Sequence, residues 1–379
     1  MPASQAVKTR AIGVLSELGS CPAVSFLEDP VAARIETYLQ EMGLAVDLDA
    51  YGNLIAHLPG RSDYEGDKTP IAFVAHMDHP GFEAVELKGN KLIARALGGV
   101  PQSCFTDRVP VQVVMPGGER LRGETAGSYG RKDQRTVSVQ LPEAIALEFP
   151  RAVVFDLPDF HFQGELIHMR AADDLVGCAG IITALHMLAS EEVTGAVFGV
   201  FTRAEEVGLI GARLIAEERL LPEDTIVVSI EASKSLPGAA IGEGPVIRVG
   251  DASLTFDAEA EAVLVRAKEE LKEKTPGFRA QRQLMSGGTC EASAFRFHGY
   301  RTTGIAIPLG NYHNATPEGG VGAEYVHVED FLGGVELIAQ AARCVARRKE
   351  AHPWKRMRDL DGEFRRRLAA NRPVRETRS

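Results

Sequence analysis

The 379-residue sequence has few cysteines, a single tryptophan and no long hydrophobic run. Its five cysteines are odd in number and widely spaced, which argues against a disulfide framework and against a cysteine-rich zinc module. Free thiols of this kind are typical of a reducing cytoplasm. No segment of about 18 apolar residues occurs, and residues 1–19 predict an amphipathic helix without a signal-peptide core. We therefore expect a cytoplasmic protein that does not bind membranes.

The formal net charge is −10, but the two signs are unevenly distributed along the chain. Residues 347–379 contain 12 lysines and arginines against 5 acidic residues, so this segment carries +7 and residues 1–346 carry −17. An acidic body repels phosphates, which argues against nucleic acid as a partner. The basic segment could form a nucleic-acid or membrane patch, but it has few aromatic residues between its charges, which favours a solvated C-terminal tail.

The length of 379 residues predicts two or three domains, since a domain has roughly 150 residues. A helix is expected at residues 30–42, and apolar strands are expected within residues 45–58 and 69–78. A second series of strands and helices runs from a helix at 174–192 to a last helix at 326–349. Strands that alternate with helices predict a three-layer α/β domain.

The segment between these two series has a different pattern. Residues 83–167 contain short β-type runs separated by glycine and proline, and no long helical period. We therefore expect a small all-β, barrel-like domain inserted into the α/β domain. The α/β domain would consist of residues 1–82 and 168–346, and residues 347–379 would form the basic tail.

Histidine and carboxylate residues follow the apolar strands or open a helix. These candidates are His76 and Asp78, Asp173 and Asp174, Glu205 and Glu206, Glu231, and His313. In open α/β sheets, ligands bind at the carboxyl ends of the strands, so we expect these side chains to meet at one edge. Two histidines with several carboxylates suit a divalent metal, and a two-metal hydrolase needs this number and kind of groups.

Each candidate by itself has an ordinary explanation. An acidic pair such as Asp173-Asp174 commonly caps a helix, and adjacent glutamates are usually solvated. The spacing of His76 and Asp78 is more informative, because alternate side chains of an extended segment share a face and an aspartate can orient an imidazole. Glu231 is placed at the end of a buried strand, where an unpaired charge is costly, which indicates a cation partner.

The order of these motifs resembles that of the dinuclear-metal aminopeptidases of the tetrahedral-aminopeptidase and glutamyl-aminopeptidase family, some of which carry an old endoglucanase label. The resemblance covers residues 25–345 and is carried by several motifs, among them AHMDHPGF, AADDLVGCAG, FTRAEEVGLIGA and YHNATPE. It implies a three-layer α/β/α metallopeptidase domain with an inserted small barrel-like domain that mediates oligomerisation. It also implies a homo-oligomer, with a dodecameric tetrahedral cage as the usual form, and peptide substrates.

The resemblance further implies a role for each candidate. The ligands of two divalent ions would be His76, Asp173 and Glu231 for one, and Asp173, Glu206 and His313 for the other, with Asp173 bridging. Glu205 would be the general base, Asp78 would orient His76, and the Asp173–Asp174 peptide would be cis. Zinc is the expected metal, with cobalt or manganese as alternatives. A water that bridges the metals would attack the N-terminal peptide bond while Glu205 takes its proton.

The sequence also departs from the family pattern. His79 replaces a common glutamate, Leu175 replaces an arginine, and Cys290 alters a GGTDA-like motif, which puts the substrate preference and the cage in question. Two alternatives remain open: a related co-catalytic amidohydrolase, such as a dipeptidase or deacylase, and a metal-bearing scaffold without catalysis. The position of the inserted segment before Asp173 favours the aminopeptidase over the first. The intact Glu205-Glu206 pair argues against the second.

Overall fold

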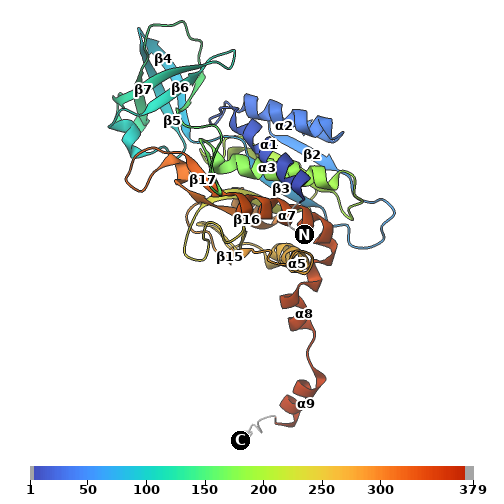
Figure 1. Cartoon of the computed structure of the whole chain (residues 1–379). Coiled ribbons are helices and arrows are strands. Elements are labelled where there is room, and N and C mark those ends of the chain that lie inside the picture. Colours follow the sequence, from blue (N-terminus) through green and yellow to red (C-terminus); the bar gives the residue numbers. More distant parts are fainter. Residues whose placement is uncertain (1–3, 372–379) are drawn as a thin grey trace, which may run out of the picture.

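The computed structural model describes residues 4–371 and has a large mixed sheet of 11 strands at its centre (Figure 1). The main path of the sheet is β1-β2-β12-β3-β13-β16-β17-β11-β10, and β14 and β15 attach beside β16. In chain order these strands are β1 (Ala45–Leu48), β2 (Leu54–Leu58), β3 (Ile71–His76), β10 (His161–Gln163), β11 (Leu166–Met169), β12 (Val197–Thr202), β13 (Ile226–Lys234), β14 (Val246–Arg248), β15 (Gln281–Gln283), β16 (Arg301–Gly310) and β17 (Glu324–His327).

Helices cover both faces of this sheet, which explains why its central strands are largely apolar and almost entirely buried. Strands β12, β3, β13 and β16 are parallel, and every residue of β3 is buried. The main core lies between the sheet and α1 (Gln5–Gly19), α2 (Asp29–Glu41), α3 (Ala172–Leu188), α5 (Ala258–Lys274) and α7 (Val328–Cys344). On the other face, α4 (Ile210–Glu217) and α6 (Glu291–Phe297) form a smaller core.

A closed barrel of six antiparallel strands lies between β3 and α3 in the chain (Figure 1). In barrel order its strands are β4 (Gly81–Lys88), β5 (Lys91–Leu97), β8 (Thr136–Gln140), β7 (Arg120–Ser128), β6 (Pro110–Val114) and β9 (Arg151–Phe155). Two short 3-10 helices, η1 (Gln102–Phe105) and η2 (Lys132–Gln134), accompany them. Phe82, Val111, Val139 and Phe155 belong to a separate core inside the barrel. The predicted fold class, α/β layers with a small all-β barrel, is confirmed.

The barrel ends earlier than the predicted insert at residues 83–167. Strands β10 and β11 lie within that range, but β11 pairs with β17 and extends the large sheet. The local sequence of a short strand does not show which sheet it joins, because its partner lies more than 150 residues away. The division into two domains at these boundaries stays a prediction.

The segment predicted to be a basic tail begins as part of the packed body. In the 3-10 helix η4 (Val345–Glu350), the Arg348 side chain is buried and forms ion pairs of 2.7 Å with Asp67 and 2.9 Å with Glu259. The prediction of a solvated tail from residue 347 is therefore wrong for its first residues, because acidic partners distant in sequence neutralise them.

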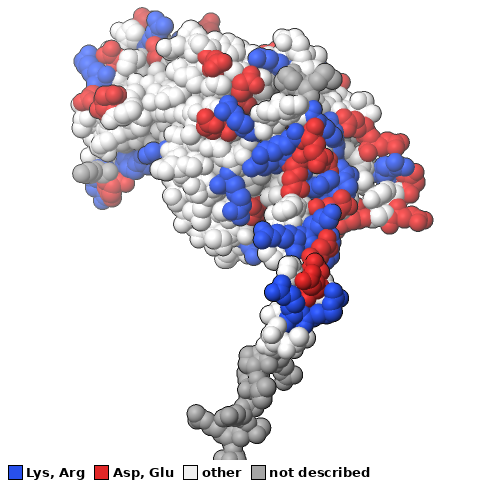
Figure 2. All heavy atoms as spheres, turned by 60° about the horizontal axis from the view of Figure 1, so that its bottom comes forward, with Lys and Arg blue, Asp and Glu red and all other residues white. Residues whose placement is uncertain are grey.

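Beyond η4 the chain leaves the body. The helices α8 (His352–Arg358) and α9 (Gly362–Ala370) extend away from it in Figure 1 and have no buried residue. Basic and acidic side chains are mixed on the surface from which this extension departs (Figure 2). Residues 372–379 of the predicted tail lie outside the described residues. Among residues 4–371, no helix combines the length and apolarity needed to cross a bilayer.

Candidate metal centre

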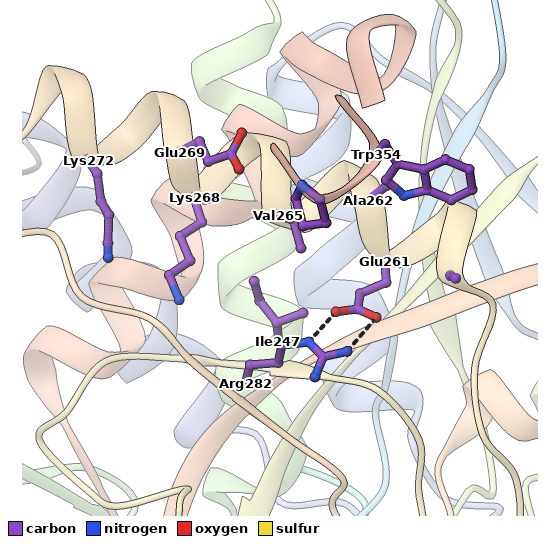
Figure 3. A pocket seen from close by; sticks show the side chains of 11 residues that line it. Ile247, Glu261, Ala262, Val265, Lys268, Glu269, Lys272, Arg282 and Trp354 are labelled. Atoms are coloured by element: carbon purple, nitrogen blue, oxygen red, sulfur yellow. Dashed lines mark hydrogen bonds and ion pairs between the residues drawn. The ribbon is translucent and has the colours of Figure 1, made fainter. Parts of the chain in front are cut away.

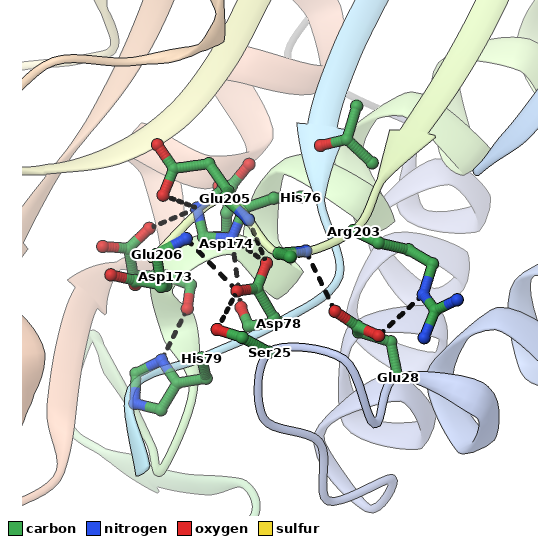
Figure 4. A network of polar contacts seen from close by, with 12 residues as sticks. Ser25, Glu28, His76, Asp78, His79, Asp173, Asp174, Arg203, Glu205 and Glu206 are labelled. Carbon is green, nitrogen blue, oxygen red and sulfur yellow. Dashed lines mark hydrogen bonds and ion pairs between the residues drawn. The ribbon is translucent and has the colours of Figure 1, made fainter. Parts of the chain in front are cut away.

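The seven predicted site residues come from five separate segments and lie together at one edge of the large sheet (Figure 4 shows five of them). His76 ends β3, Glu205 and Glu206 follow β12, and Asp173 lies at the start of α3. The parallel strands bring their carboxyl ends to the same edge, as the sequence predicted. The Asp173–Asp174 peptide is cis.

Glu231 differs from its predicted place at a strand end. It lies inside β13, which continues for three more residues to Lys234. The strand continues because Ala232, Ser233 and Lys234 still pair with β16 in parallel register. The Glu231 side chain nevertheless points to the same group of residues as His76 and Asp173.

The carboxylate of Asp173 lies between two histidines. Its Oδ1 is 3.2 Å from His76 Nε2, and its Oδ2 is 3.8 Å from His313 Nε2. His313, in the 3-10 helix η3 (Tyr312–Asn314), also lies 3.3 Å from Glu206 through its Nε2. Asp173 can therefore face two cations at once, one on each side.

Within residues 4–371, three groups of donor atoms are close enough to hold a metal ion. In each group, the ligand atoms lie within 4.8 Å of one another. The groups are His76, Asp173 and Glu231; Asp173, Glu206 and His313; and His76, Glu205 and Glu206. The first two match the ligand sets implied by the family resemblance. The third includes Glu205, so proximity alone does not separate Glu205 from the ligands.

Several buried polar atoms at this centre have no hydrogen-bond partner among the described residues. They are His76 Nε2, Asp173 Oδ1, Glu206 Oε1 and Glu231 Oε2. A buried polar atom without a partner costs about 1–3 kcal/mol, and more when it is charged. Imidazole nitrogen and carboxylate oxygen are donors that divalent zinc, cobalt and manganese accept. The residues present therefore fit a divalent metal centre.

Electrostatics at the centre also indicate that a cation belongs there. Burial, together with the nearby Asp173 carboxylate, raises the pKa of Glu231 to about 8. Burial likewise raises the pKa of Glu206, with Asp173 and Glu205 adding repulsion. Burial lowers the pKa of His313 to about 4, so that its imidazole is neutral and able to bind a metal at neutral pH.

Asp78 holds the backbone of the two adjacent glutamates. Its Oδ1 accepts a hydrogen bond of 2.9 Å from the Glu205 N–H, and its Oδ2 accepts one of 3.2 Å from the Glu206 N–H. Towards His76, the shorter contact is made by the Asp78 carbonyl oxygen, 3.0 Å from Nδ1, whereas the carboxylate lies 3.5 Å away. The predicted contact of Asp78 with His76 is therefore only one of several, because Asp78 also contacts the backbone of Glu205 and Glu206.

Glu324 is a central residue of the site that the sequence reasoning missed. It is fully buried, and its Oε2 accepts hydrogen bonds from the N–H groups of Ala172 and Asp173, at 2.9 and 3.0 Å. Its Oε1 accepts one of 2.9 Å from the His313 N–H. One carboxylate therefore joins the segments that carry two candidate ligands. An acidic residue at the first position of a short strand was the only local signal.

A second missed group comes from the loop between α1 and α2 (Figure 4). Ser25 Oγ donates a hydrogen bond of 2.6 Å to Asp78. Glu28 accepts hydrogen bonds from the Ala204 N–H and from Arg203 Nε, at 2.9 and 2.7 Å. This loop therefore supports the segment that carries Glu205. The sequence around Glu28 shows only the start of a helix.

The three departures from the family pattern are all buried. His79 Nδ1 lies 2.7 Å from the carbonyl oxygen of Asp173, and its Nε2 lies 2.8 Å from Asn314 Oδ1. It thus connects two segments of the centre and is not a surface residue. Leu175 belongs to the main core, and Cys290 is fully buried at the start of α6.

Glu324→Gln should weaken metal binding about 10- to 100-fold, which is typical when a group that orients metal ligands is changed. The amide keeps one acceptor oxygen, so either the Asp173 or the His313 N–H loses its partner. The measurement is a titration of the metal-free protein with zinc against a chelator of known affinity. Glu217→Gln, on the exposed side of α4, is the control. Equal zinc affinity in wild type and Glu324→Gln would contradict this role.

Known sequences and structures resemble this chain along most of its length. A sequence model described as M42 glutamyl aminopeptidase matches residues 140–336, more than half of the 379 residues. The structure described as PhTET1-12s, a dodecamer in the asymmetric unit, is 27% identical, with a TM-score of 0.71 over 87% of this chain and 98% of that chain.

Two further solved structures have the same fold. The TET1 peptidase of Pyrococcus horikoshii, described as able to assemble into a tetrahedron or a large octahedral shell, is 25% identical, with a TM-score of 0.71 over 88% of this chain and 99% of that chain. The aminopeptidase APDkam598 of the archaeon Desulfurococcus kamchatkensis is 23% identical, with a TM-score of 0.74 over 91% of this chain and 98% of that chain.

Proposed function

The chain belongs to the M42 glutamyl aminopeptidase family, and from this premise we propose that it is a dinuclear metallo-aminopeptidase that releases N-terminal residues from peptides. The observation that carries the proposal is a set of buried donor atoms, on His76, Asp173, Glu206 and Glu231, that have no hydrogen-bond partner within residues 4–371. A metal-bearing scaffold without catalysis would need these donors but not the further carboxylate of Glu205 beside them.

The ligands of the two ions would be His76, Asp173 and Glu231 for one, and Asp173, Glu206 and His313 for the other. Zinc is the expected metal, and cobalt or manganese would suit the same donors. When bound, such ions lower the pKa of a coordinated water and polarise the scissile carbonyl. Asp173 would be shared, because its two oxygens face the two histidines.

Glu205 is the residue best placed to act as general base. Its Oε2 lies 3.9 Å from His76 Nε2, and its backbone N–H is held by Asp78. It would accept a proton from the attacking water and return this proton to the leaving amine. Burial raises the pKa of Glu205, and the neighbouring carboxylates raise it further, which would strengthen its affinity for that proton.

We further propose a homo-oligomeric, cytoplasmic enzyme. The neighbour PhTET1-12s is a dodecamer, and the closed barrel that precedes α3 is the part expected to mediate such contacts. The five cysteines are all free thiols, which suits a reducing compartment. Native mass spectrometry of the purified chain should show one oligomer with a dodecameric mass, and a monomer would contradict the cage.

Metal-loaded protein should hydrolyse aminoacyl p-nitroanilides that have a free α-amine, and their N-acetylated counterparts should react much more slowly. Metal analysis should give two ions per chain, chelation should abolish the activity, and zinc, cobalt or manganese should restore it. A preference for N-acetylated substrates would favour a deacylase instead. If fully loaded protein cleaves no substrate of a broad panel, the aminopeptidase assignment fails.

A further inference from the structure

A cavity lies outside the candidate metal centre, between α5, the strands β14 and β15, and the start of α8 (Figure 3). Its volume of about 440 Å³ lies in the range of roughly 300–1,000 Å³ that is typical of small-molecule pockets. No residue of the candidate metal centre lines it. The cavity therefore needs an explanation of its own.

One part of the cavity is apolar. Ile247, Ala262 and Val265 line it from β14 and α5, and Trp354 lines it from α8. Trp354 is the single tryptophan of the chain and remains 40% exposed. An indole that is only half covered leaves apolar surface available for a ligand.

The other part of the cavity is charged, and its acidic residues already have partners. Glu261 accepts a hydrogen bond of 3.1 Å from Arg282 Nη2, and Glu269 accepts one of 3.0 Å from the His352 N–H. These contacts occupy the carboxylates that could otherwise neutralise a nearby lysine.

Two lysines of the lining, Lys268 and Lys272, are left without a partner. Within residues 4–371, neither ammonium group forms a hydrogen bond or an ion pair. They are four residues apart on α5 and therefore lie on the same face of the helix (Figure 3). Lys268 is half-buried, and its pKa is lowered by burial and by the charges of Lys272 and Arg282. An anion between the two lysines would relieve this repulsion.

We propose that this cavity binds a small amphipathic anion. The apolar body of the ligand lies against Trp354 and the α5 wall, and its carboxylate contacts the ammonium groups of Lys268 and Lys272. Charge-assisted hydrogen bonds of this kind are stronger than neutral ones, so the carboxylate supplies selectivity and the apolar body supplies buried area. The site is separate from the proposed peptidase centre, and its ligand is not the peptide substrate.

The single tryptophan makes the proposal directly testable in the full-length protein. Octanoate should change the fluorescence of Trp354 in a saturable way, because the probe would lie against the indole. Octanamide, which has the same chain without the charge, should bind at least about tenfold more weakly, as expected for the loss of a charge-assisted contact. Acetate, which has the charge without the chain, should cause no saturable change.

Two variants separate the charged and apolar parts. The double variant Lys268→Gln/Lys272→Gln should weaken the binding of octanoate about tenfold and leave the binding of octanamide unchanged. Val265→Phe should fill the cavity and weaken the binding of octanoate, although this substitution changes none of the charged residues. Arg356→Gln is the matched control, because it removes a positive charge two residues from Trp354 but outside the lining. No saturable change in wild type, equal binding of octanoate and octanamide, or unchanged binding in the double lysine variant would overturn the proposal.

Discussion

Glu205→Gln should lower kcat by about 10²- to 10⁴-fold, the range lost when a general base is removed, while the protein keeps its metal. Glutamine has nearly the same shape as glutamate but cannot accept the proton of the attacking water. The Glu205 backbone is held by its N–H contact with Asp78, which the substitution leaves intact. KM for aminoacyl p-nitroanilides should change little, because the effect concerns the chemical step.

Metal analysis of the same variant decides what Glu205 does. Two ions per chain together with lost turnover would support the general-base role. Lost ions would make Glu205 a ligand, as the donor group of His76, Glu205 and Glu206 would allow. Glu217→Gln, on the exposed surface of α4, should leave both kcat and metal content unchanged. Retained turnover in Glu205→Gln would remove this residue from the proposed mechanism.

Asp173→Asn should abolish both metal binding and activity. Its loss of turnover should exceed the loss caused by a substitution that affects only one of the two ions. Its carboxylate faces His76 through Oδ1 and His313 through Oδ2. An asparagine has one acceptor oxygen and no charge, and its amide nitrogen would point a donor at one of the cations. Metal content per chain, measured after equilibration with zinc, should fall from two ions to fewer than one.

The thermal stability of metal-free protein distinguishes this effect from misfolding. Asp173 repels Glu206 and Glu231 in the absence of metal, which contributes to their raised pKa values. Removing its charge relieves that repulsion, so metal-free Asp173→Asn should melt at the same temperature as metal-free wild type, or higher. Added zinc should then raise the melting temperature of wild type only. The exposed Asp47→Asn should behave as wild type, and a zinc response in Asp173→Asn would contradict the bridging role.

Much of the fold follows from local patterns in the sequence. The buried strand β3 is apolar from Ile71 to Ala75 because helices cover both faces of the parallel sheet. The barrel segment instead has short β-type runs separated by glycine and proline, without a long helical period. These two patterns are visible without any coordinates, and they predicted the α/β layers and the small all-β unit.

The residues of the candidate site were also predictable in part from the sequence. The rule that ligands bind at the carboxyl ends of parallel strands pointed to His76, Glu205 and Glu231 before their distances were known. Contacts between distant segments were not predictable. Glu324 contacts the Asp173 N–H from 151 residues away, and Arg348 pairs with Asp67 across 281 residues. Nothing in the local sequence of Glu324 or Arg348 identifies these partners.

The sequence by itself determined which donors this protein has, in what order, and on which kind of element. Residue type and hydrophobic period are local properties, so the strands, the helices and the histidine and carboxylate positions could all be inferred from them. Only the tertiary structure decided that Asp173 lies between His76 and His313 and that Glu324 holds the segments of Asp173 and His313. It also decided that Lys268 and Lys272 have no partner among residues 4–371. The reason is that strand order and register set the distances between residues far apart in the chain, and these distances determine which charges neutralise one another.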